Sequence, residues 1–425
     1  MSQFIIVDNG SYNIKSGYST FEEPMIQSNS ITKTKDGSIY ISNDYRNTNN
    51  HSGIIFKRPH DQGNLVSWET EKLVWDYAFN EISTQYITSS KTSKSKSKTM
   101  DFSSDSEIDF KSLGLILTET PFQLPQLSIN TDQIVFEEFE FQNYYRCIPQ
   151  SLVPWTLDTD IENDFNLIID CGFNATWIIP VIYKSVYWKG VKKLPIGGKL
   201  LNGLLREFIS FRHYDINEDP ILINTIKEST CFMAANFNEA LKTKEANYCQ
   251  FILPDFKTTT TGYVKKNDGK PLQDNGDLQS LNLVDERFVI PESLYHPEII
   301  FDNSPNNNSI IHSTSFKNLS DLVIESIMSS PEIARPLLSQ NISIVGGTSL
   351  LPNFSERLKT EISKELPQDW KIKILHNDYR NDLTNWYGGL ILSQSDIIDN
   401  ITISKQDYYE HGSNWCQKQF GFKNI

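Results

Sequence analysis

Two segments far apart in the chain are built alike, and this repetition constrains the fold more than any other feature. In each, a short apolar run rich in β-branched residues ends in aspartate, a glycine turn follows, and a second run returns as a strand. The first segment is Phe4–Tyr18 with Asp8 before its turn, and the second is Asn166–Ile182 with Asp170 before its turn. Asn9-Gly10 is a dipeptide typical of a tight hairpin. We therefore expect an α/β protein with two related strand-hairpin units, one in each of two lobes that face each other across a central cleft.

A third element combines a strand, a glycine turn and a helix. Ile342–Val345 is an apolar strand, Gly346-Gly347 follows it, and Phe354–Ile362 has the pattern of a helix. Asn353 with Glu356 three residues later predicts a capping box at the start of that helix. Such a turn can place backbone N–H groups beside a ligand.

Paired glycine hairpins with an acidic residue at each strand end suit a phosphate chain and a divalent metal. Glycine lets backbone N–H groups approach phosphate oxygens, and the turn forms an anion-binding nest. The aspartates would hold Mg²⁺ through the waters that it retains. Tight turns in a twisted sheet have the same residues, so the pattern alone leaves both interpretations open.

Composition limits the class of protein. With 425 residues, the chain is too long for one ordinary core, which again favours two lobes. Because the net charge is -14, we do not expect the chain to bind DNA phosphates in general. The charge is compatible with protein partners, including basic ones such as histones. Five scattered cysteines without C-x-x-C spacing predict neither a disulfide framework nor a zinc site. No apolar run reaches the length of a membrane span and the N-terminus does not read as a secretory signal, so we expect an intracellular protein.

Local patterns predict several helices and two insertions. Helices are expected at Glu69–Phe79, at Gln133–Phe141 after Asp132, and from the capping box Ser404–Asp407 to Gly412. Thr88–Ser106 is dominated by Ser, Thr and Lys and is expected to be a disordered surface insertion, within a stretch near residues 88–110. The Asn-rich Asp302–Ser309 is expected to be a second loop.

At these residues the chain resembles the actin, heat-shock ATPase and sugar-kinase fold. Further strings single out the actin family, and they are collinear from residue 4 to about residue 420. They are Val7–Ser11, similar to the first phosphate loop; Gln133–Phe139, similar to the helix with the catalytic glutamine; Glu286–Phe288; Val345–Ser349, similar to the nucleotide clamp; and Ile403–Tyr408. The resemblance implies a small lobe of residues 1–160 and 385–425 (subdomains 1 and 2) and a large lobe of residues 161–384 (subdomains 3 and 4).

Within the family, other strings are similar to the nuclear actin-related protein 6 branch. They are Lys57–Glu69, Phe136–Gln142, Gly197–Leu201 and Leu253–Phe256. This resemblance implies a non-catalytic scaffold subunit of a nuclear chromatin-remodelling complex that exchanges a variant histone into nucleosomes and so affects transcription. The implied partners are subunits that include a Snf2-type motor ATPase, and nucleosomes or histones through the complex, without a membrane and without strong direct DNA binding. The implied location is the nucleus, with some protein in the cytoplasm.

The resemblance also assigns roles to single residues. Asp8, Gln133 and Asp170 stand at the family's metal-water and catalytic positions, so that no residue would bind metal directly. The phosphate and nucleoside contacts fall on Gly10, Ser11, Lys15, Gly172, Gly198, Lys227, Glu228, Gly346 and Gly347.

Several of these positions depart from the family. Tyr12 replaces a loop glycine of the first hairpin, and Trp177 stands where the family has a water-orienting histidine. Tryptophan cannot accept a proton. The other replacements are Phe173 and Asn174 in the second hairpin and Asn224, Leu350 and Leu351 around the base. We therefore expect no hydrolysis, with ATP or ADP and Mg²⁺ held weakly as a structural ligand or absent.

Two other functions share the fold. An ATPase or sugar kinase would need a catalytic base in the cleft. A sugar kinase would also need inserted loops that bind its substrate. The sequence reveals neither. A filament-forming actin would need a repeated self-complementary surface. The insertion after residue 87 and the altered residues 36–50 argue against a filament.

Overall fold

The computed structural model describes most of the chain as two compact units. The described residues are 3–47, 54–94, 110–157, 164–213, 220–255, 259, 261–265, 279–300 and 317–421. The first unit takes residues 1–45, 56–163 and 377–425, and the second takes residues 46–55 and 164–376. Residues 377–384, which we expected in the larger lobe, therefore belong to the first unit. The predicted loop Asp302–Ser309 lies outside the described residues.

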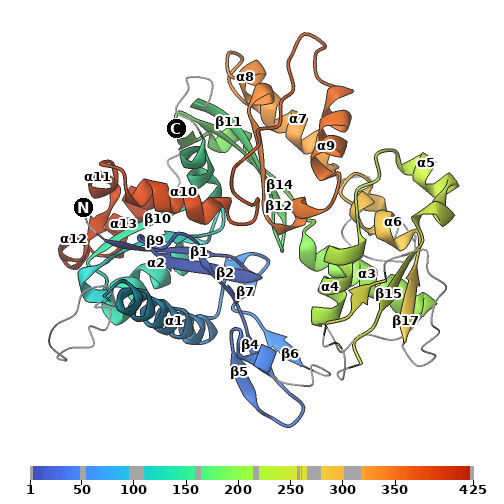
Figure 1. The fold of residues 1–425 in the computed structure, drawn as a ribbon. Coiled ribbons are helices and arrows are strands. Elements are labelled where there is room, and N and C mark those ends of the chain that lie inside the picture. The colour runs from blue at the N-terminus through green and yellow to red at the C-terminus, as the bar shows by residue number, and fades with distance from the viewer. Residues whose placement is uncertain are drawn as a thin grey trace. The chain divides into compact units, whose positions relative to one another are not determined.

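A six-stranded sheet in the order β19-β10-β9-β1-β2-β3 is the base of the first unit (Figure 1). Its strands are β1 (Phe4–Asn9), β2 (Asn13–Tyr18), β3 (Met25–Ser28), β9 (Gly114–Thr118), β10 (Asn143–Cys147) and β19 (Ile403–Ser404). β1 and β2 form the predicted hairpin, and β1, β9 and β10 are parallel. Since parallel strands end at one edge of a sheet, Asp8, Thr118 and Cys147 lie at the same edge.

The rest of the first unit consists of two small sheets and of helices. The strands are β4 (Ile31–Lys33), β5 (Ile39–Ile41) and β6 (Ile55–Lys57), in the order β5-β4-β6, and the pair β7 (His60–Asp61) and β8 (Asn64–Leu65). The helices are α1 (Trp68–Lys94), α2 (Pro125–Gln133), α10 (Thr384–Ser393), α11 (Ile398–Ile401), α12 (Lys405–His411) and α13 (Ser413–Phe420). Short helical turns are η1 (Asp44–Asn47), η2 (Phe110–Ser112), η3 (Ile134–Glu138) and η4 (Pro149–Thr156).

Helix α10 packs against the β1–β2 hairpin in the first core. The Trp386 indole N–H donates to the carbonyl of Ile6 at 3.2 Å, and its ring lies against Gly17. A Cβ at Gly17 would come within 2.7 Å of that ring, so any larger residue would displace the tryptophan. Both hairpin strands are therefore held by one buried side chain from the C-terminal part of the chain.

The second unit repeats the strand arrangement of the first. Its main sheet has the order β13-β12-β11-β18, and β14 also pairs with β12. The strands are β11 (Phe165–Cys171), β12 (Thr176–Ile182), β13 (Ser185–Val186), β14 (Lys192–Leu194) and β18 (Ile342–Val345). β11 pairs antiparallel with β12 and parallel with β18, as β1 pairs with β2 and β9. The predicted pair of related hairpin units is thus confirmed.

Helices and a small sheet complete the second unit. The sheet has the order β16-β15-β17, with β15 (Cys249–Ile252), β16 (Tyr263–Val264) and β17 (Ser280–Leu283). The helices are α3 (Gly198–Arg212), α4 (Pro220–Thr230), α5 (Phe237–Lys242), α6 (Glu286–Glu292), α7 (Leu319–Ser329), α8 (Arg335–Gln340) and α9 (Phe354–Ser363). Short turns are η6 (Trp188–Gly190), η7 (Lys244–Asn247), η8 (Pro297–Ile299) and η10 (Gly347–Leu350).

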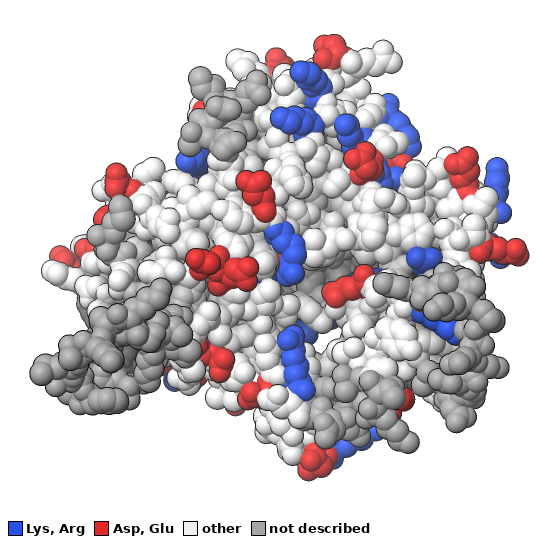
Figure 2. Space-filling view, viewed as in Figure 1, with Lys and Arg blue, Asp and Glu red and all other residues white. Residues whose placement is uncertain are grey.

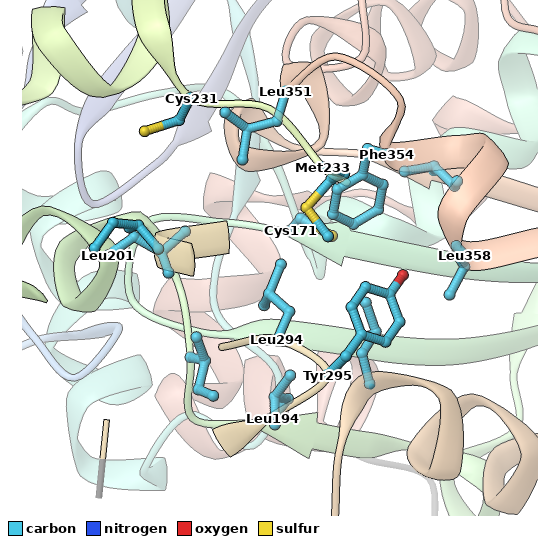
Figure 3. Packing of buried hydrophobic residues seen from close by; sticks show 14 of the residues in the cluster. Cys171, Leu194, Leu201, Cys231, Met233, Leu294, Tyr295, Leu351, Phe354 and Leu358 are labelled. Carbon is cyan, nitrogen blue, oxygen red and sulfur yellow. The ribbon is translucent and has the colours of Figure 1, made fainter. Parts of the chain in front are cut away.

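One continuous core fills this unit. Figure 3 shows side chains from β11, β14, α3 and α9 pointing into it, among them Cys171, Leu194, Leu201 and Phe354. Each of these four side chains is at most 1% exposed. Burial raises the pKa of the Cys171 thiol, which agrees with its expected role as a small apolar residue in a core.

The prediction of a helix at Gln133–Phe141 with Asp132 as its cap is wrong in where the helix begins and in the residue that caps it. Helix α2 runs from Pro125 to Gln133 and continues into η3, a wider π-type turn. Asp132 is not a cap but a buried partner of Arg146, with Oδ1 3.1 Å from Nε. Burial raises the pKa of Asp132, and the neighbouring Glu119, which pairs with the same guanidinium, raises it further.

Other local predictions had mixed outcomes. The capping box of Ser404 and Asp407 is confirmed, and Gly412 ends α12 with φ +71°. Helix α9 is confirmed, but Asn353 adopts left-handed φ of 66° and its side chain does not cap. Helix α1 continues to Lys94, so the polar stretch after Thr88 begins as helix, and residues 95–106 lie outside the described part.

Candidate functional site

The turn of the first hairpin is wider than its Asn9-Gly10 dipeptide predicts. Asn9 pairs with Ile14, so the turn comprises residues 10–13, and neither Asn9 nor Gly10 has positive φ. A Cβ at Gly10 would lie 2.5 Å from the carbonyl oxygen of Asn13. The glycine is needed for the close approach of the two sides of the turn, not for a left-handed backbone.

Asp8 is held by groups from two strands. The Lys15 ammonium donates to Asp8 Oδ2 at 3.0 Å, because the antiparallel register sets these residues opposite each other. The Thr118 hydroxyl donates to Asp8 Oδ1 at 2.9 Å and accepts from the backbone N–H of Asn9 at 2.9 Å. The strand ends thus gather a carboxylate, an ammonium group and a hydroxyl at one edge of the sheet, of which the sequence predicted Asp8 and Lys15 but not Thr118.

Arg58 closes the other side of this turn. Its Nη1 donates to the carbonyls of Ser11, Tyr12 and Asn29 at 3.2, 2.7 and 3.2 Å. The guanidinium carbon lies 4.5 Å from the centroid of the Tyr12 ring, within the range of a cation–π contact. Tyr12, at the position where the resemblance implies a glycine, is therefore packed against an arginine of the same unit.

Beneath the turn lies a buried polar network centred on Glu71. Trp75 Nε1 donates to Glu71 Oε1 at 2.9 Å, and Asn29 Nδ2 lies 3.5 Å from the same oxygen. Asn29 also donates to Asn9 Oδ1 at 3.2 Å and to the Gly10 carbonyl at 3.1 Å. Burial raises the pKa of Glu71 to about 7. The network ties helix α1 to the hairpin, and nothing in the local sequence pattern singles it out.

The second hairpin has the same register with different chemistry. Asp170 pairs with Trp177 across β11 and β12, in the relation that Asp8 has to Lys15. The Lys193 ammonium lies 5.0 Å from the centroid of the Trp177 ring. Gly346, with φ +89°, ends the parallel strand beside Asp170, and a Cβ there would lie 2.6 Å from Asp170 Oδ1. An indole and a backbone turn thus stand beside this carboxylate.

A glycine cradle lies next to the second hairpin. The N–H of Gly198 and the Thr348 hydroxyl both donate to the Gly172 carbonyl, at 3.0 and 3.2 Å. A Cβ at Gly198 would meet Lys227 Nζ, the Phe173 ring and Thr348 Oγ1, each at 3.4 Å. A cation, a ring and a hydroxyl therefore lie close against the start of helix α3, where a side chain at position 198 would crowd them.

Lys227 is the buried cation of this cradle. It donates to Asn224 Oδ1 at 3.0 Å, and Asn224 in turn donates to Glu228 Oε1 at 2.8 Å. Burial lowers the pKa of Lys227, which Glu228 partly offsets. The predicted residues Gly172, Gly198, Lys227 and Glu228 are thus brought together, with Asn224 at their centre.

Gln133 is not brought to either hairpin. It is the exposed last residue of α2, a helix that packs against α13. Strand β10 ends at Cys147, which pairs with Thr118, and η4 begins two residues later. Gln150 in η4 is 1% exposed. Gln150 is thus a buried glutamine that closely follows this strand end, and the local sequence pattern does not indicate it.

The comparisons with known proteins decide the family. The family model described as Actin matches residues 1–421. The chain belongs to the actin family. Proteins named Actin-like protein ARP6 are similar to it over full length: 56% identity for the Debaryomyces hansenii protein (100% of this chain and 99% of that protein), 53% for Candida albicans (100% and 99%) and 35% for Saccharomyces cerevisiae (99% and 98%).

Actin-family chemistry at these half-sites would use a nucleotide with Mg²⁺, and the residues fit it in part. In the first unit Lys15 is a cation at the hairpin edge, and in the second unit Lys227 is a cation beside Gly198, so each unit by itself offers a group of the charge that a phosphate requires. When bound, the nucleotide would supply the phosphate anhydride that the family cleaves. Among the described residues there is no cluster of His, Cys, Asp and Glu that could hold a metal ion directly, and no helix that is long and apolar enough to cross a membrane.

Proposed function

We propose that this actin-family chain is a non-catalytic scaffold subunit of a nuclear chromatin-remodelling complex that exchanges a variant histone into nucleosomes. The observation that carries the proposal is full-length similarity to proteins named Actin-like protein ARP6. The pairing of Trp177 with Asp170 supports the non-catalytic part, because an indole cannot accept the proton of an attacking water. Partners would be a Snf2-type motor ATPase and, through the complex, histones.

Direct DNA binding is not part of this proposal. The chain has a net charge of -14, and on the face drawn in Figure 2 Lys and Arg are interspersed with Asp and Glu. Counterion release from DNA requires several cations to contact neighbouring phosphates. The charge favours a role in which other subunits contact DNA. As a subunit of such a complex, the protein would work in the nucleus, with a fraction in the cytoplasm.

A second candidate function is a weak ATPase. It is favoured by the intact set of Asp8, Lys15 and Thr118 in the first unit and by the cradle at Gly198 in the second. Under the scaffold proposal, the same residues hold ATP or ADP as a structural ligand, without turnover.

One purification tests both candidates. The tagged full-length chain is isolated from nuclear extract beside the tag alone, its partners are identified by mass spectrometry, and the purified chain is assayed for release of phosphate from ATP. The proposal predicts a large Snf2-type motor among the partners and no turnover by the chain.

A Lys15→Ala chain serves as the matched control for contaminating ATPases. Turnover that belongs to this protein falls in the variant, whereas turnover by a contaminant persists. Recovery of the chain without partners, together with turnover that needs Lys15, would overturn the scaffold proposal in favour of the enzyme.

A further inference from the structure

The small sheet β5-β4-β6 of the first unit has one covered side (Figure 1). Thr32 in β4 is fully buried, and it pairs across β5 with Tyr40, whose carbonyl accepts from the Thr32 hydroxyl at 3.3 Å. In β6 the Phe56 ring lies edge-to-face with the buried Tyr45, with centroids 5.3 Å apart. Because side chains alternate along a strand, the residues next to Thr32, Tyr40 and Phe56 point to the opposite, open side.

The open side of this sheet is mostly apolar. It consists of Ile31 and Lys33 from β4, Ile39 and Ile41 from β5, and Ile55 and Lys57 from β6, which we call the isoleucine face. Ile39 is 64% exposed and Ile55 is 68% exposed. An antiparallel sheet with one face in water normally carries polar residues on that face. The fold therefore does not account for the isoleucines.

The isoleucines form one patch and are not scattered single residues. Ile31 lies directly opposite Ile41, and Ile39 lies beside that pair on β5. Directly opposite side chains in an antiparallel pair have Cβ atoms about 5 Å apart, so that they are in contact. Exposed apolar patches with a polar rim mark surfaces that partners cover. Ile333 differs, because it is a single exposed isoleucine between α7 and α8.

The charged residues of this face are cations. Lys33 and Lys57 are exposed, and neither has an ion pair within the part of the chain that the structure describes. Residues 24–60 contain five Lys or Arg and only two acids, Asp36 and Asp44, and the undescribed residues 48–53 among them contain no acid. Asp36 accepts from the hydroxyls of its own turn, which lowers its pKa. Helix α1 contacts β5, and its exposed Glu69 forms no ion pair with either lysine. The charge of the isoleucine face therefore complements acidic residues.

From these observations we infer that the isoleucine face binds an amphipathic helix of a protein partner. The apolar stripe of the helix packs on the isoleucines, and Asp or Glu residues that flank the stripe pair with Lys33 and Lys57. The inference rests on the scaffold proposal, because it names the chemistry of one partner segment of the scaffold.

The size of the face suits one helix. Three strands span two strand spacings, which is about 10 Å. An α-helix with its side chains is also about 10 Å wide. A second copy of the chain fits less well, because a symmetric contact would set Lys33 and Lys57 against the same lysines of the other copy. An anionic lipid surface fits less well too, because it repels a chain of net charge -14.

The test uses the purified full-length chain and two fluorescent peptides. One peptide is helical with a leucine stripe flanked by Glu, and the other has Lys in place of each Glu. Fluorescence anisotropy is expected to show that the wild type binds the Glu peptide more tightly, by about tenfold. Lys33→Glu/Lys57→Glu is expected to reverse this preference. The matched control, Lys359→Glu at an exposed lysine of α9, is expected to retain it.

A second pair of variants tests the apolar part of the contact. Ile39→Thr/Ile55→Thr keeps β-branched residues in the strands and removes apolar surface, so it is expected to weaken binding of the Glu peptide about tenfold. Its Tm is expected to stay close to that of the wild type, because both side chains are exposed. The matched control is Ile333→Thr, at a residue that is 84% exposed, and it is expected to leave peptide binding unchanged.

Four results would overturn the inference. The first two are equal binding of the two peptides by the wild type, including no binding of either, and an equal loss of binding in the Ile333→Thr chain. The third is a dimer of the wild type that Ile39→Thr/Ile55→Thr abolishes, which would assign the face to a second copy. The fourth is tighter binding to phosphatidylserine vesicles than to the Glu peptide, which would assign it to a lipid surface. All four are measured on the isolated chain, so the recovery of a motor subunit from nuclear extract stays a separate test of the scaffold proposal.

Discussion

At the scale of single residues, Glu71 is a buried carboxyl group that makes stability depend on pH. Burial raises its pKa from 4.5 to about 7 in the folded protein. Between these values the folded state keeps a proton that the unfolded chain has released, so the free energy of unfolding falls as pH rises from about 4.5 to 7. The shift corresponds to about 3 kcal/mol. Glu71→Gln is expected to match the wild type at pH 4.5 and to be more stable by up to that amount at pH 8, in urea unfolding.

The control for this pH effect is Glu69→Gln, an exposed residue on the same helix. Its free energy of unfolding is expected to follow the wild type at every pH. A Glu71→Gln chain that differs from the wild type equally at pH 4.5 and pH 8 would show that Glu71 is already ionised in the folded protein at low pH.

Arg58 is the second residue whose effect can be predicted. It donates to three backbone carbonyls of the first hairpin region, and a hydrogen bond from a charged donor contributes about 1.5–3 kcal/mol. Arg58→Met keeps the apolar stem and removes the donors, so it is expected to cost about 3 kcal/mol in the free energy of unfolding. Exposed Arg206→Met is the control and is expected to change little. Equal stabilities of the two variants would contradict the assigned role of Arg58.

At the scale of elements, two helices have similar capping sequences, but substitution of the residue before each helix is expected to change stability differently. Ser404 caps α12 by accepting from the N–H of Asp407 at 3.1 Å, so Ser404→Ala is expected to cost about 1 kcal/mol. Asn353 precedes α9 in a left-handed conformation without capping it, and glycine suits that conformation better. Asn353→Gly is therefore expected to be neutral or stabilising by a few tenths of a kcal/mol. Thermal unfolding of both variants measures the contrast, and equal losses would refute it.

The same contrast explains how much the sequence could predict. The strands β1, β2, β11 and β12 followed from short apolar runs, because a strand buried on both faces shows its pattern locally. The site residues on those strands, such as Asp8 and Lys15, were found for the same reason. The predicted cap at Asp132 was wrong because its partner, Arg146, lies in strand β10, outside the local pattern of the helix. Arg58, Asn29 and Thr118 were missed because only the register and the packing of α1 bring them to the hairpin.

At the scale of the whole molecule, the chain has two hydrophobic cores that share no residue among those described. Phe136 belongs to the first core, where it stacks on Tyr408 with ring centroids 4.5 Å apart, and Phe354 belongs to the second. Truncation of either ring leaves a cavity and is expected to cost about 3–5 kcal/mol.

Because each cavity weakens the packing of only one core, the two truncations should differ in where the protein opens. In hydrogen exchange, Phe136→Ala is expected to speed the exchange of peptides from β9, β10 and α12, and Phe354→Ala that of peptides from β11, α3 and α9. Each variant is compared with wild-type protein in enough urea to give the same free energy of unfolding. Global unfolding then contributes equally to exchange in both samples. If either variant speeds exchange equally in both sets of peptides, the two units unfold as one, and the separation into two cores does not mark independently opening parts of the protein.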